Sequence, residues 1–364
     1  MKVKIPQEKL CDVLSKVRNV VPAKTSLPII SSILVTGEGG VIRFTSTDLK
    51  MVIEKELDDC EIIKEGKITI RAHLFYNLIS RLPKDEVSIE TLEENQIVVK
   101  CGRTEVKYYT IPPDDFPPTP LVVDDSPLVI SETLLLDMLK KVAFAVCTDE
   151  SRYALTGVLM EASDGKFSVV ATDGRRLSLR REYGVVSDSK SMRVTIPERT
   201  IRELLSQMEG VGDVRIFSGG GRVAFEFNRT KLISSLVEGS FPNYEVVIPR
   251  DYTKEVVIST AEWKEVLRRA ESMKSTIVRF RIAGESLEVY VQNPEVGDFN
   301  EGVDVEYNGD EVKIGFNIEY LLDVVEHIPT DKVVMSVKDG SSPCVIKPFG
   351  SKDEYLNIIM PVRA

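Results

Sequence analysis

Residues 156–183 read TGVLMEASDGKFSVVATDGRRLSLRREY, and this stretch recurs in altered form elsewhere in the chain. It holds an alternating apolar run, a turn with an acidic residue and Gly, a second apolar run, the pair Thr172-Asp173 and a charged run. Residues 31–57, SSILVTGEGGVIRFTSTDLKMVIEKEL, keep the same order. A weaker third copy spans residues 277–307, with Asn293 in the place of Asp173. Because alternation with a period of two indicates strands, the sequence predicts three related antiparallel sheets.

Segments with helical periodicity flank each copy. The leading segments are residues 7–21, 131–146 and 259–273, and Ser131 and either Ser259 or Thr260 are expected as N-caps. The following segments, residues 68–102, 194–227 and 312–349, each predict a strand, a helix and two more strands. Apolar residues at helical spacing, such as Leu74, Leu78 and Leu82, predict a buried stripe on each of these second helices.

Proline turns divide the repeats. Residues 111–118, IPPDDFPP, and 238–249, EGSFPNYEVVIP, close the first two copies, and Pro117 and Pro242 keep the spacing of the two Thr-Asp pairs. We therefore predict an α+β chain of three tandem domains, each with two helices and antiparallel sheets. Their expected bounds are 1–120, 121–249 and 250–364.

The composition of the 364 residues narrows the class of protein. Apolar residues make up 43%, and no apolar run approaches the roughly 20 residues of a membrane-spanning helix, so we expect a cytoplasmic protein. The five cysteines are scattered and the two histidines stand apart, which favours neither a disulfide framework nor a metal site. No cofactor is expected. A net charge of −10 disfavours a protein that grips nucleic acid by neutralising many phosphates.

Two motifs invite an enzymatic interpretation. The paired Thr-Asp dipeptides resemble the carboxylate dyad that aspartic proteases build from two halves. That chemistry needs a hydroxyl residue and Gly after the Asp, whereas here Thr comes first and Leu49 follows Asp48. Residues 218–222, SGGGR, lack the lysine and the helix of a phosphate-binding loop, and their alternating flanks predict a hairpin turn. The sequence thus predicts a protein without catalytic activity.

Basic residues lie off the apolar stripes of most predicted helices. Their positions include Lys9 and Lys16, Arg71 and Arg81, Lys140 and Lys141, Arg199 and Arg202, and Lys264 and Arg268. Charged helix faces ordinarily serve solubility. If the helices share one surface, however, these side chains are compatible with weak phosphate contact that does not depend on sequence.

Several motifs carry a resemblance over the full length of the chain. The segments LPIISSILV, RYALTGVLME, ATDGRRL, SFPNYEVVIP and the terminal MPVR occur in this order. They are similar to the most characteristic motifs of the bacterial DNA polymerase III beta subunit, the replicative sliding clamp. The resemblance implies three copies of the DNA clamp fold per chain. It also implies a head-to-tail homodimer whose helices line the hole of a closed ring and whose sheets form the outer wall.

In that family the ring slides on duplex DNA and acts as a processivity factor. The resemblance implies as partners duplex DNA held topologically, a second copy of the chain, the polymerase III alpha subunit, the clamp loader, and other polymerases and repair proteins. The protein partners are expected to dock short peptides rich in Gln, Leu and Phe. Two such apolar anchors, less the cost of ordering the peptide, suggest an affinity of about −8 kcal/mol, which is micromolar.

Site residues are assigned by the same resemblance. The residues expected in the partner-peptide pocket are Arg152, Leu155, Thr172, Gly174, Arg175, Arg176, Leu177, Pro242, Val247, Asn317, Tyr320, Ser342, Ile358, Met360, Pro361, Val362 and Arg363. The residues expected to face DNA are Lys9, Lys16, Lys24, Arg71, Arg81, Lys140, Lys141, Tyr153, Arg199, Arg202, Lys264 and Arg268. Val106 and Tyr108 are expected at the dimer seam opposite residues 270–274, which include Met273. Asp173 is expected to form a turn.

Four positions depart from the family pattern. Arg175 stands where histidine is common, Ala154 where a second tyrosine is frequent, Val246 where arginine is frequent, and Val362 where methionine is usual. These differences leave the peptide preference of the pocket open. The negative net charge also leaves open a rival interpretation, a pseudo-threefold scaffold that binds only proteins.

Overall fold

The structure, a computed structural model, describes residues 1–92, 95–187 and 191–362. The chain forms two compact units, one of residues 1–136 and 199–236 and one of residues 137–198 and the chain from 237 onward. Helix α3 (Glu132–Val142) crosses this division. The division differs from the predicted three domains because strands of neighbouring repeats share sheets, and the predicted boundary residues stay predictions.

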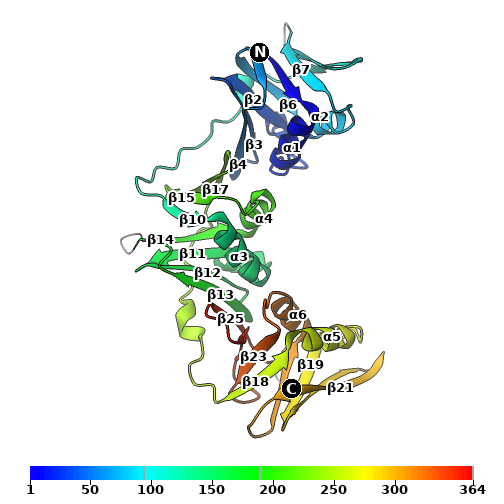
Figure 1. Cartoon of the computed structure of the whole chain (residues 1–364), viewed down its shortest axis with the longest axis vertical. Coiled ribbons are helices and arrows are strands. Elements are labelled where there is room, and N and C mark those ends of the chain that lie inside the picture. The colour runs from blue at the N-terminus through cyan, green and yellow to red at the C-terminus, as the bar shows by residue number, and fades with distance from the viewer. Residues whose placement is uncertain (93–94, 188–190, 363–364) are drawn as a thin grey trace. The chain divides into compact units, whose positions relative to one another are not determined.

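The first unit contains two antiparallel sheets (Figure 1). The five-stranded sheet has the order β5 (Glu61–Lys64), β1 (Lys2–Pro6), β7 (Glu86–Thr91), β8 (Gln96–Cys101) and β9 (Thr104–Tyr109). The eight-stranded sheet has the order β10 (Leu128–Ser131), β15 (Asp213–Gly219), β16 (Arg222–Phe227), β17 (Thr230–Ser235), β4 (Met51–Leu57), β3 (Val41–Thr47), β2 (Ser32–Glu38) and β6 (Gly66–Arg71). The pairing of β17 with β4 joins the second repeat to the first.

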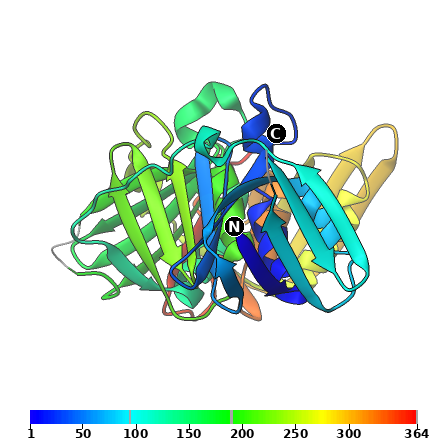
Figure 2. The same cartoon turned by 90° about the horizontal axis from the view of Figure 1, so that it is seen from above.

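Helices cover these sheets. The helices of the first unit are α1 (Gln7–Val17), α2 (Ala72–Ile79) and most of α4 (Glu198–Gln207). Helix α1 packs against β1 of one sheet and against β3 and β4 of the other, so both sheets share one core (Figure 2). The residues 218–222 form the tight hairpin turn between β15 and β16 that their sequence predicts.

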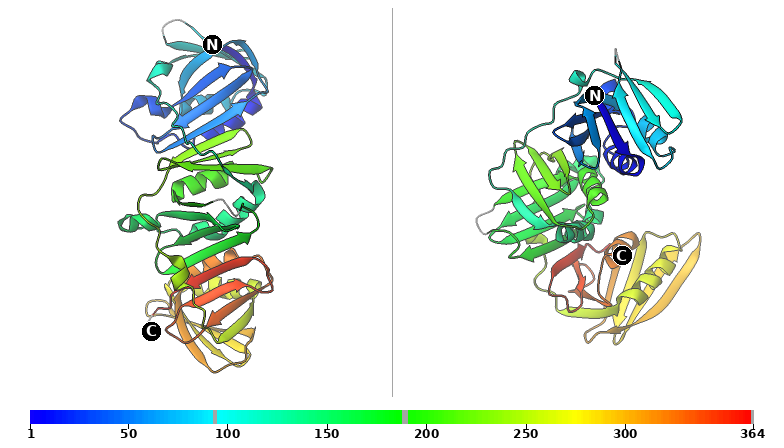
Figure 3. Two further views of the ribbon diagram at one scale, coloured as in Figure 1. Left: turned by 90° about the vertical axis from the view of Figure 1, so that its left-hand side faces the viewer. Right: turned by 45° about the horizontal axis from the view of Figure 1, so that its top comes forward.

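The second unit is built on a twelve-stranded antiparallel sheet. Its order is β14 (Met192–Pro197), β11 (Gly157–Ser163), β12 (Lys166–Thr172), β13 (Arg176–Tyr183), β25 (Glu354–Ile359), β24 (Cys344–Pro348), β23 (Lys332–Val337), β18 (Lys254–Ser259), β21 (Gly297–Glu306), β20 (Ser286–Asn293), β19 (Ile277–Ala283) and β22 (Val312–Asn317). Strand β13 of the second repeat pairs along its length with β25 of the third (Figure 3).

Two helices, α5 (Thr260–Glu271) and α6 (Ile318–Glu326), pack together on this sheet. The side chain of Ser259 accepts a hydrogen bond from the Glu262 N–H at 3.4 Å, which confirms the predicted N-cap of α5. Fully buried Trp263 lies 6.1 Å from the Phe280 ring, centroid to centroid. Burial of each such side chain contributes about 1.5–3 kcal/mol, so this core fixes the helices on the sheet.

Two sequence predictions on helices were wrong in detail. Helix α1 ends at Val17 instead of residue 21, because β-branched residues and a proline follow. In α2 the core face is formed by Ala72, Phe75 and Ile79, whereas Leu74 is 51% exposed. The helix is thus rotated relative to the stripe that Leu74, Leu78 and Leu82 predicted.

Short 3₁₀ helices complete the fold. They are η1 (Pro28–Ser31), η2 (Pro113–Asp115), η3 (Ala143–Ala145), η4 (Glu150–Leu155) and η5 (Tyr244–Val247). Segment η3 directly follows α3. The helix predicted over 131–146 is therefore α-helical only to Val142 and ends in a 3₁₀ turn. The segments η4 and η5 both lie in the second unit and frame the site described next.

Candidate functional site

The Thr172-Asp173 pair forms a self-contained turn after β12. The Thr172 hydroxyl donates to the Arg176 carbonyl at 2.6 Å and accepts from the Gly174 N–H at 3.0 Å. The Asp173 carboxylate accepts the N–H groups of Arg175 and Arg176 at 2.8 and 2.9 Å. The carboxylate is occupied by its own backbone, which confirms the prediction that Asp173 is a turn former.

The Arg176 side chain ties this turn to the third repeat. Its guanidinium donates to Asp173 at 3.1 Å, to Asp323 on α6 at 2.5 Å and to the Phe144 carbonyl at 2.7 Å. The same group lies 4.4 Å from the centroid of the Tyr320 ring. Burial, with a smaller contribution from Asp173, raises the pKa of Tyr320 above its ordinary value, so the phenol is protonated at neutral pH.

Segment η5 supplies the opposite wall. The Asn243 side chain caps it by accepting the Glu245 N–H at 3.2 Å. Below it, the buried Tyr244 hydroxyl donates to Glu161 at 2.9 Å, and burial raises the pKa of Tyr244 to about 12. This anchor leaves Val246 and Val247 exposed at 75% and 51%, which is unusual for valines and points to a binding surface.

Between these walls lies a cavity of about 500 Å³, here named the apolar cavity. It is lined by Leu155, Thr172, Gly174, Arg175, Arg176, Leu177, Pro242, Asn243, Tyr244, Val246, Val247, Ile248, Pro249, Pro343, Ile358 and Met360. Its floor continues into buried Leu177 and Ile358, and Met360 is 45% exposed at its edge. Such a surface can bind aliphatic or aromatic side chains, with arginines at the rim to orient them.

Ten of the residues predicted for the partner-peptide pocket line this cavity. They are Leu155, Thr172, Gly174, Arg175, Arg176, Leu177, Pro242, Val247, Ile358 and Met360. Of the others, Arg152 donates to the Asp173 carbonyl at 2.8 Å and so braces the turn from behind. Pro361 follows Met360 in the chain, and Arg363 lies outside the described residues.

The remaining predicted pocket residues hold neighbouring elements. Asn317 caps α6 by accepting the N–H groups of Glu319 and Tyr320, and Tyr320 stacks under Arg176. Ser342 donates both its N–H and its hydroxyl to Asp339. Together with Ser341, these bonds lower the pKa of Asp339 to about 2, so its turn persists at any physiological pH. Val362 lines a different cavity.

Sequence reasoning missed five lining residues, Asn243, Tyr244, Ile248, Pro249 and Pro343, and named a sixth, Val246, only as a position that affects peptide preference. Four of the five belong to the run from 243 to 249, of which the family motif had assigned only Val247 to the pocket. The available signal was the run of Val246, Val247 and Ile248 between prolines, because contiguous apolar residues at the surface often mark an interaction site.

The residues expected to face DNA differ in their surroundings. Lys9, Lys24, Arg71, Arg81, Lys140, Tyr153, Arg199, Arg202 and Arg268 are exposed, and Lys16 and Lys264 are half-buried. Lys141 is the most enclosed of the set: it is 8% exposed, with its ammonium 2.8 Å from Asp137 and above the Tyr355 ring. Its contact with DNA stays a prediction.

Acidic residues accompany several of these cations. Lys16 pairs with Glu209 at 2.5 Å, and Arg199 pairs with Asp48. Lys264 and Arg268 converge on Glu326 at 3.5 and 2.9 Å. The helix faces are therefore partly neutralised.

Two of the three predicted seam residues lie on an open sheet edge, and the third follows helix α5. Val106 and Tyr108 are half-buried on β9, the edge strand of the five-stranded sheet. Met273 is half-buried and packs against the core of the third repeat, and its carbonyl accepts a hydrogen bond from Asn293 at 2.9 Å.

Over residues 1–92, 95–187 and 191–362, no cluster of three or more His, Cys, Asp or Glu side chains is arranged to hold a metal ion. In the same residues, no helix has the length and apolarity to cross a membrane.

Comparison with known proteins gives the family. Models of the DNA polymerase III beta subunit match in chain order, the N-terminal domain over residues 1–120, the central domain over 129–243 and the C-terminal domain over 245–363. The beta sliding clamp of Caulobacter vibrioides is 32% identical over the whole of both chains. That of Pseudomonas aeruginosa is 30% identical over 99% of each.

Solved structures agree with these matches. The DNA polymerase III subunit beta from Pseudomonas aeruginosa superposes with a TM-score of 0.95 at 31% identity, and the beta subunit from Streptococcus pyogenes with 0.96 at 25%. In both cases the whole of each chain is covered. The predicted α+β fold of three clamp domains is confirmed. The chain belongs to the bacterial DNA polymerase III beta subunits, the beta sliding clamps that serve as non-catalytic processivity factors in DNA replication.

Proposed function

We propose that the apolar cavity is the docking site through which this clamp tethers its protein partners. The observation that carries the proposal is the cavity's composition, an apolar floor with Arg175 and Arg176 beside it and valines exposed on η5. The occupants are short peptides rich in Gln, Leu and Phe. They belong to the polymerase III alpha subunit, the clamp loader, other polymerases and repair proteins.

A peptide-binding assay tests this role. Met360→Ala removes an apolar side chain from the cavity edge, so a fluorescent Gln-Leu-Phe peptide is expected to bind at least about tenfold more weakly. Val296→Ala is the matched control, because Val296 is equally exposed but does not line the cavity. Equal affinity of the wild type and Met360→Ala excludes the cavity as the docking site.

We further propose that two chains associate head to tail into a ring that encircles duplex DNA in the cytoplasm. Two open strand edges support this arrangement. Among the described residues, strand β9 pairs only with β8, and β21 pairs with β18 only through its last residues, Val305 and Glu306. Pairing of β9 with the open part of β21 in the other protomer would satisfy both edges. The paired cations on the helices suit weak contact with DNA, which allows sliding.

Retention on circular DNA tests the ring. The clamp is loaded onto a nicked plasmid with its loader and ATP, and the plasmid is then cut. If the link is topological, the clamp is released when the plasmid is linearised, at a salt concentration at which the circular plasmid retains the clamp. If retention is the same on linear and circular DNA, the ring is rejected, and if no DNA is retained at all, the rival scaffold that binds only proteins is favoured.

A further inference from the structure

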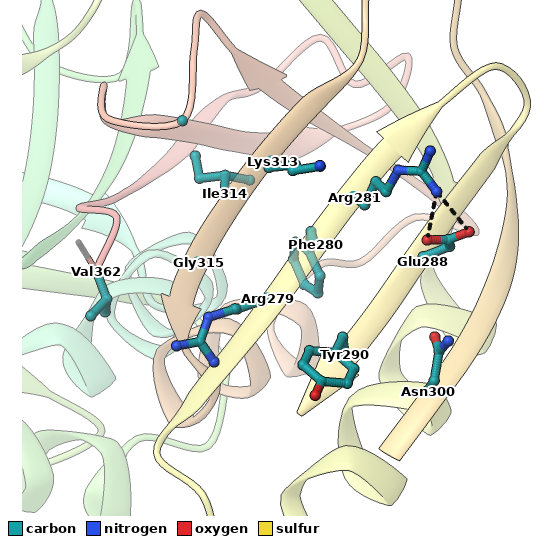
Figure 4. A pocket seen from close by; sticks show the side chains of 11 residues that line it. Arg279, Phe280, Arg281, Glu288, Tyr290, Asn300, Lys313, Ile314, Gly315 and Val362 are labelled. Carbon is teal, nitrogen blue, oxygen red and sulfur yellow. Dashed lines mark hydrogen bonds and ion pairs between the residues drawn. The ribbon is translucent and has the colours of Figure 1, made fainter. Parts of the chain in front are cut away.

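A second groove lies on the outward face of the third repeat, where β22, β19, β20 and β21 are neighbours (Figure 4). It encloses about 360 Å³. One cross-strand row runs through it from Gly315 to Arg279, Tyr290 and Asn300. We name it the Arg279 groove.

Gly315 leaves one part of the groove lining without a side chain. A Cβ placed there would lie 3.8 Å from the Arg279 side chain and 3.4 Å from the Val362 carbonyl oxygen. In Figure 4 the Arg279 side chain extends across Gly315 toward Val362. The Val362 N–H donates to the Gly315 carbonyl at 2.8 Å, so Val362 forms part of one wall of the groove.

The charges in the groove leave one cation uncompensated. Arg281 pairs with Glu288 at 3.3 Å and with Glu311 at 3.0 Å, and Lys313 pairs with Glu311 at 3.3 Å. Arg279 is half-buried, and within the described part of the chain its guanidinium has neither an ion pair nor a hydrogen bond. A half-buried guanidinium beside a tyrosine ring is suited to a carboxylate on a partly apolar segment.

The Arg279 groove and the apolar cavity share a wall. Met360 lines the cavity and donates its N–H to the Arg175 carbonyl at 2.9 Å, while Val362 lines the groove. Two residues of extended chain span at most about 7 Å. The loop after Asp339 is shared in the same way, with Gly340 in the groove and Pro343 in the cavity. One peptide that fills the cavity is long enough to reach the groove a few residues further along.

We infer that the Arg279 groove receives a carboxylate-bearing stretch of the same partner peptide that places its apolar anchors in the apolar cavity. This inference rests on the proposed docking function and adds a specificity to it. Partners with Asp or Glu flanking the anchor residues bind in preference to partners with neutral or basic flanks, because only a carboxylate compensates Arg279.

Fluorescence polarisation with matched peptides tests the inference. The probes are a Gln-Leu-Phe anchor peptide, the same peptide with a Glu-Glu pair added three residues before or after the anchor, and versions with Gln-Gln in the same places. The Glu-Glu peptide of one arrangement is expected to bind about threefold to tenfold more tightly than its Gln-Gln partner, as for a single charge-assisted pair. The gain should shrink as salt is raised, because screening weakens a partly exposed pair.

Two variants test whether Arg279 causes the tighter binding of the Glu-Glu peptide. Arg279→Gln is expected to abolish it and to leave the affinity of the bare anchor peptide unchanged. Arg281→Gln is the matched control, since Arg281 lies on the same strand and face but already has two acidic partners. The gain should survive in this control.

The outcomes separate the two proposals. Binding of the anchor peptide without any gain from Glu-Glu overturns the groove alone. A gain that persists in Arg279→Gln, or that is lost equally in Arg281→Gln, also overturns it. Failure of every peptide to bind overturns the docking function and the groove together.

Discussion

At the scale of single residues, the Thr-Asp turn is the same device in two repeats. Thr47 and Asp48 make the hydrogen bonds of Thr172 and Asp173: the hydroxyl donates to Met51 and accepts from Leu49, and the carboxylate accepts from Lys50 and Met51. The third residue has a φ of 77° at Leu49 and 83° at Gly174. The backbone geometry is thus kept even where the residue does not favour it.

Leu49 is therefore expected to be strained. A side chain in the left-handed region costs about 1 kcal/mol, and Leu49, at 51% exposure, gains little from packing. We predict that Leu49→Gly raises the thermal midpoint by about 1–3 °C despite the greater freedom of Gly in the unfolded chain. Calorimetry checks this, with Leu49→Ala as the control that keeps a Cβ and should bring no gain. A lower midpoint for Leu49→Gly would contradict the strain.

The residue scale also shows what a sequence can and cannot predict about the site. The role of Asp173 followed from local chemistry, because an Asp before Gly bonds the amides just ahead of it. The role of Arg176 did not follow from local chemistry. It lines the cavity as expected, but its guanidinium is also held by Asp323, by the Phe144 carbonyl and by the Tyr320 ring. These partners are distant in sequence, and no local pattern announces them.

At the scale of elements, periodicity predicted where helices form more reliably than which face they bury. Helix α2 shows the difference, because its apolar residues occupy more than one face and the core selects Phe75 over Leu74. The basic faces show it again. Spacing placed Lys264 and Arg268 on one side of α5, but their pairing with Glu326 depends on how α6 packs beside it.

The Glu326 pairs predict an effect on DNA contact. The hydrogen bond from Arg268 lowers the pKa of Glu326, so its carboxylate is ionised at neutral pH and neutralises α5. Glu326→Gln is expected to release Lys264 and Arg268 from Glu326, leaving Arg268 only its longer 3.5 Å contact with Glu265, and to strengthen binding to duplex DNA at low salt. The slope of log K against log salt should steepen by about one to two, as for one or two added phosphate contacts.

Fluorescence anisotropy on a labelled duplex measures this slope. Glu319→Gln serves as the charge-matched control, because Glu319 is exposed on the same helix and its carboxylate makes no ion pair with the described residues. Identical slopes for the two variants would show that the general loss of one negative charge, and not the release of the two cations, governs DNA contact.

At the scale of the whole molecule, the sequence predicted the repeats but not the sheets that neighbouring repeats share. Three copies of one strand order predicted three domains, which the family matches confirm. The pairing of β17 with β4 and of β13 with β25 brings together strands from different repeats. The alternating pattern of an edge strand predicts a strand but does not identify the strand with which it pairs. Pairing between repeats therefore cannot be predicted from the local sequence.

The remaining open edges predict the assembly. Val106 and Tyr108 on β9, together with exposed Leu74 on α2, leave apolar surface on the first repeat that its own core does not use. In a head-to-tail dimer this surface is buried against the third repeat. Replacing Val106 and Tyr108 together with Glu places charges in that contact, where burial without a partner is costly. The variant is expected to run as a monomer.

Light scattering after gel filtration distinguishes the two states, because the chain has a mass of 40.7 kDa and a dimer has twice that mass. Tyr109→Glu is the control on the same strand, since Tyr109 is 84% exposed and points away from the half-buried face that holds Val106 and Tyr108. It should remain a dimer. An unchanged dimer in the double variant would place the seam elsewhere, whereas a wild-type monomer would leave β9 and the open part of β21 without the partners that a closed ring requires.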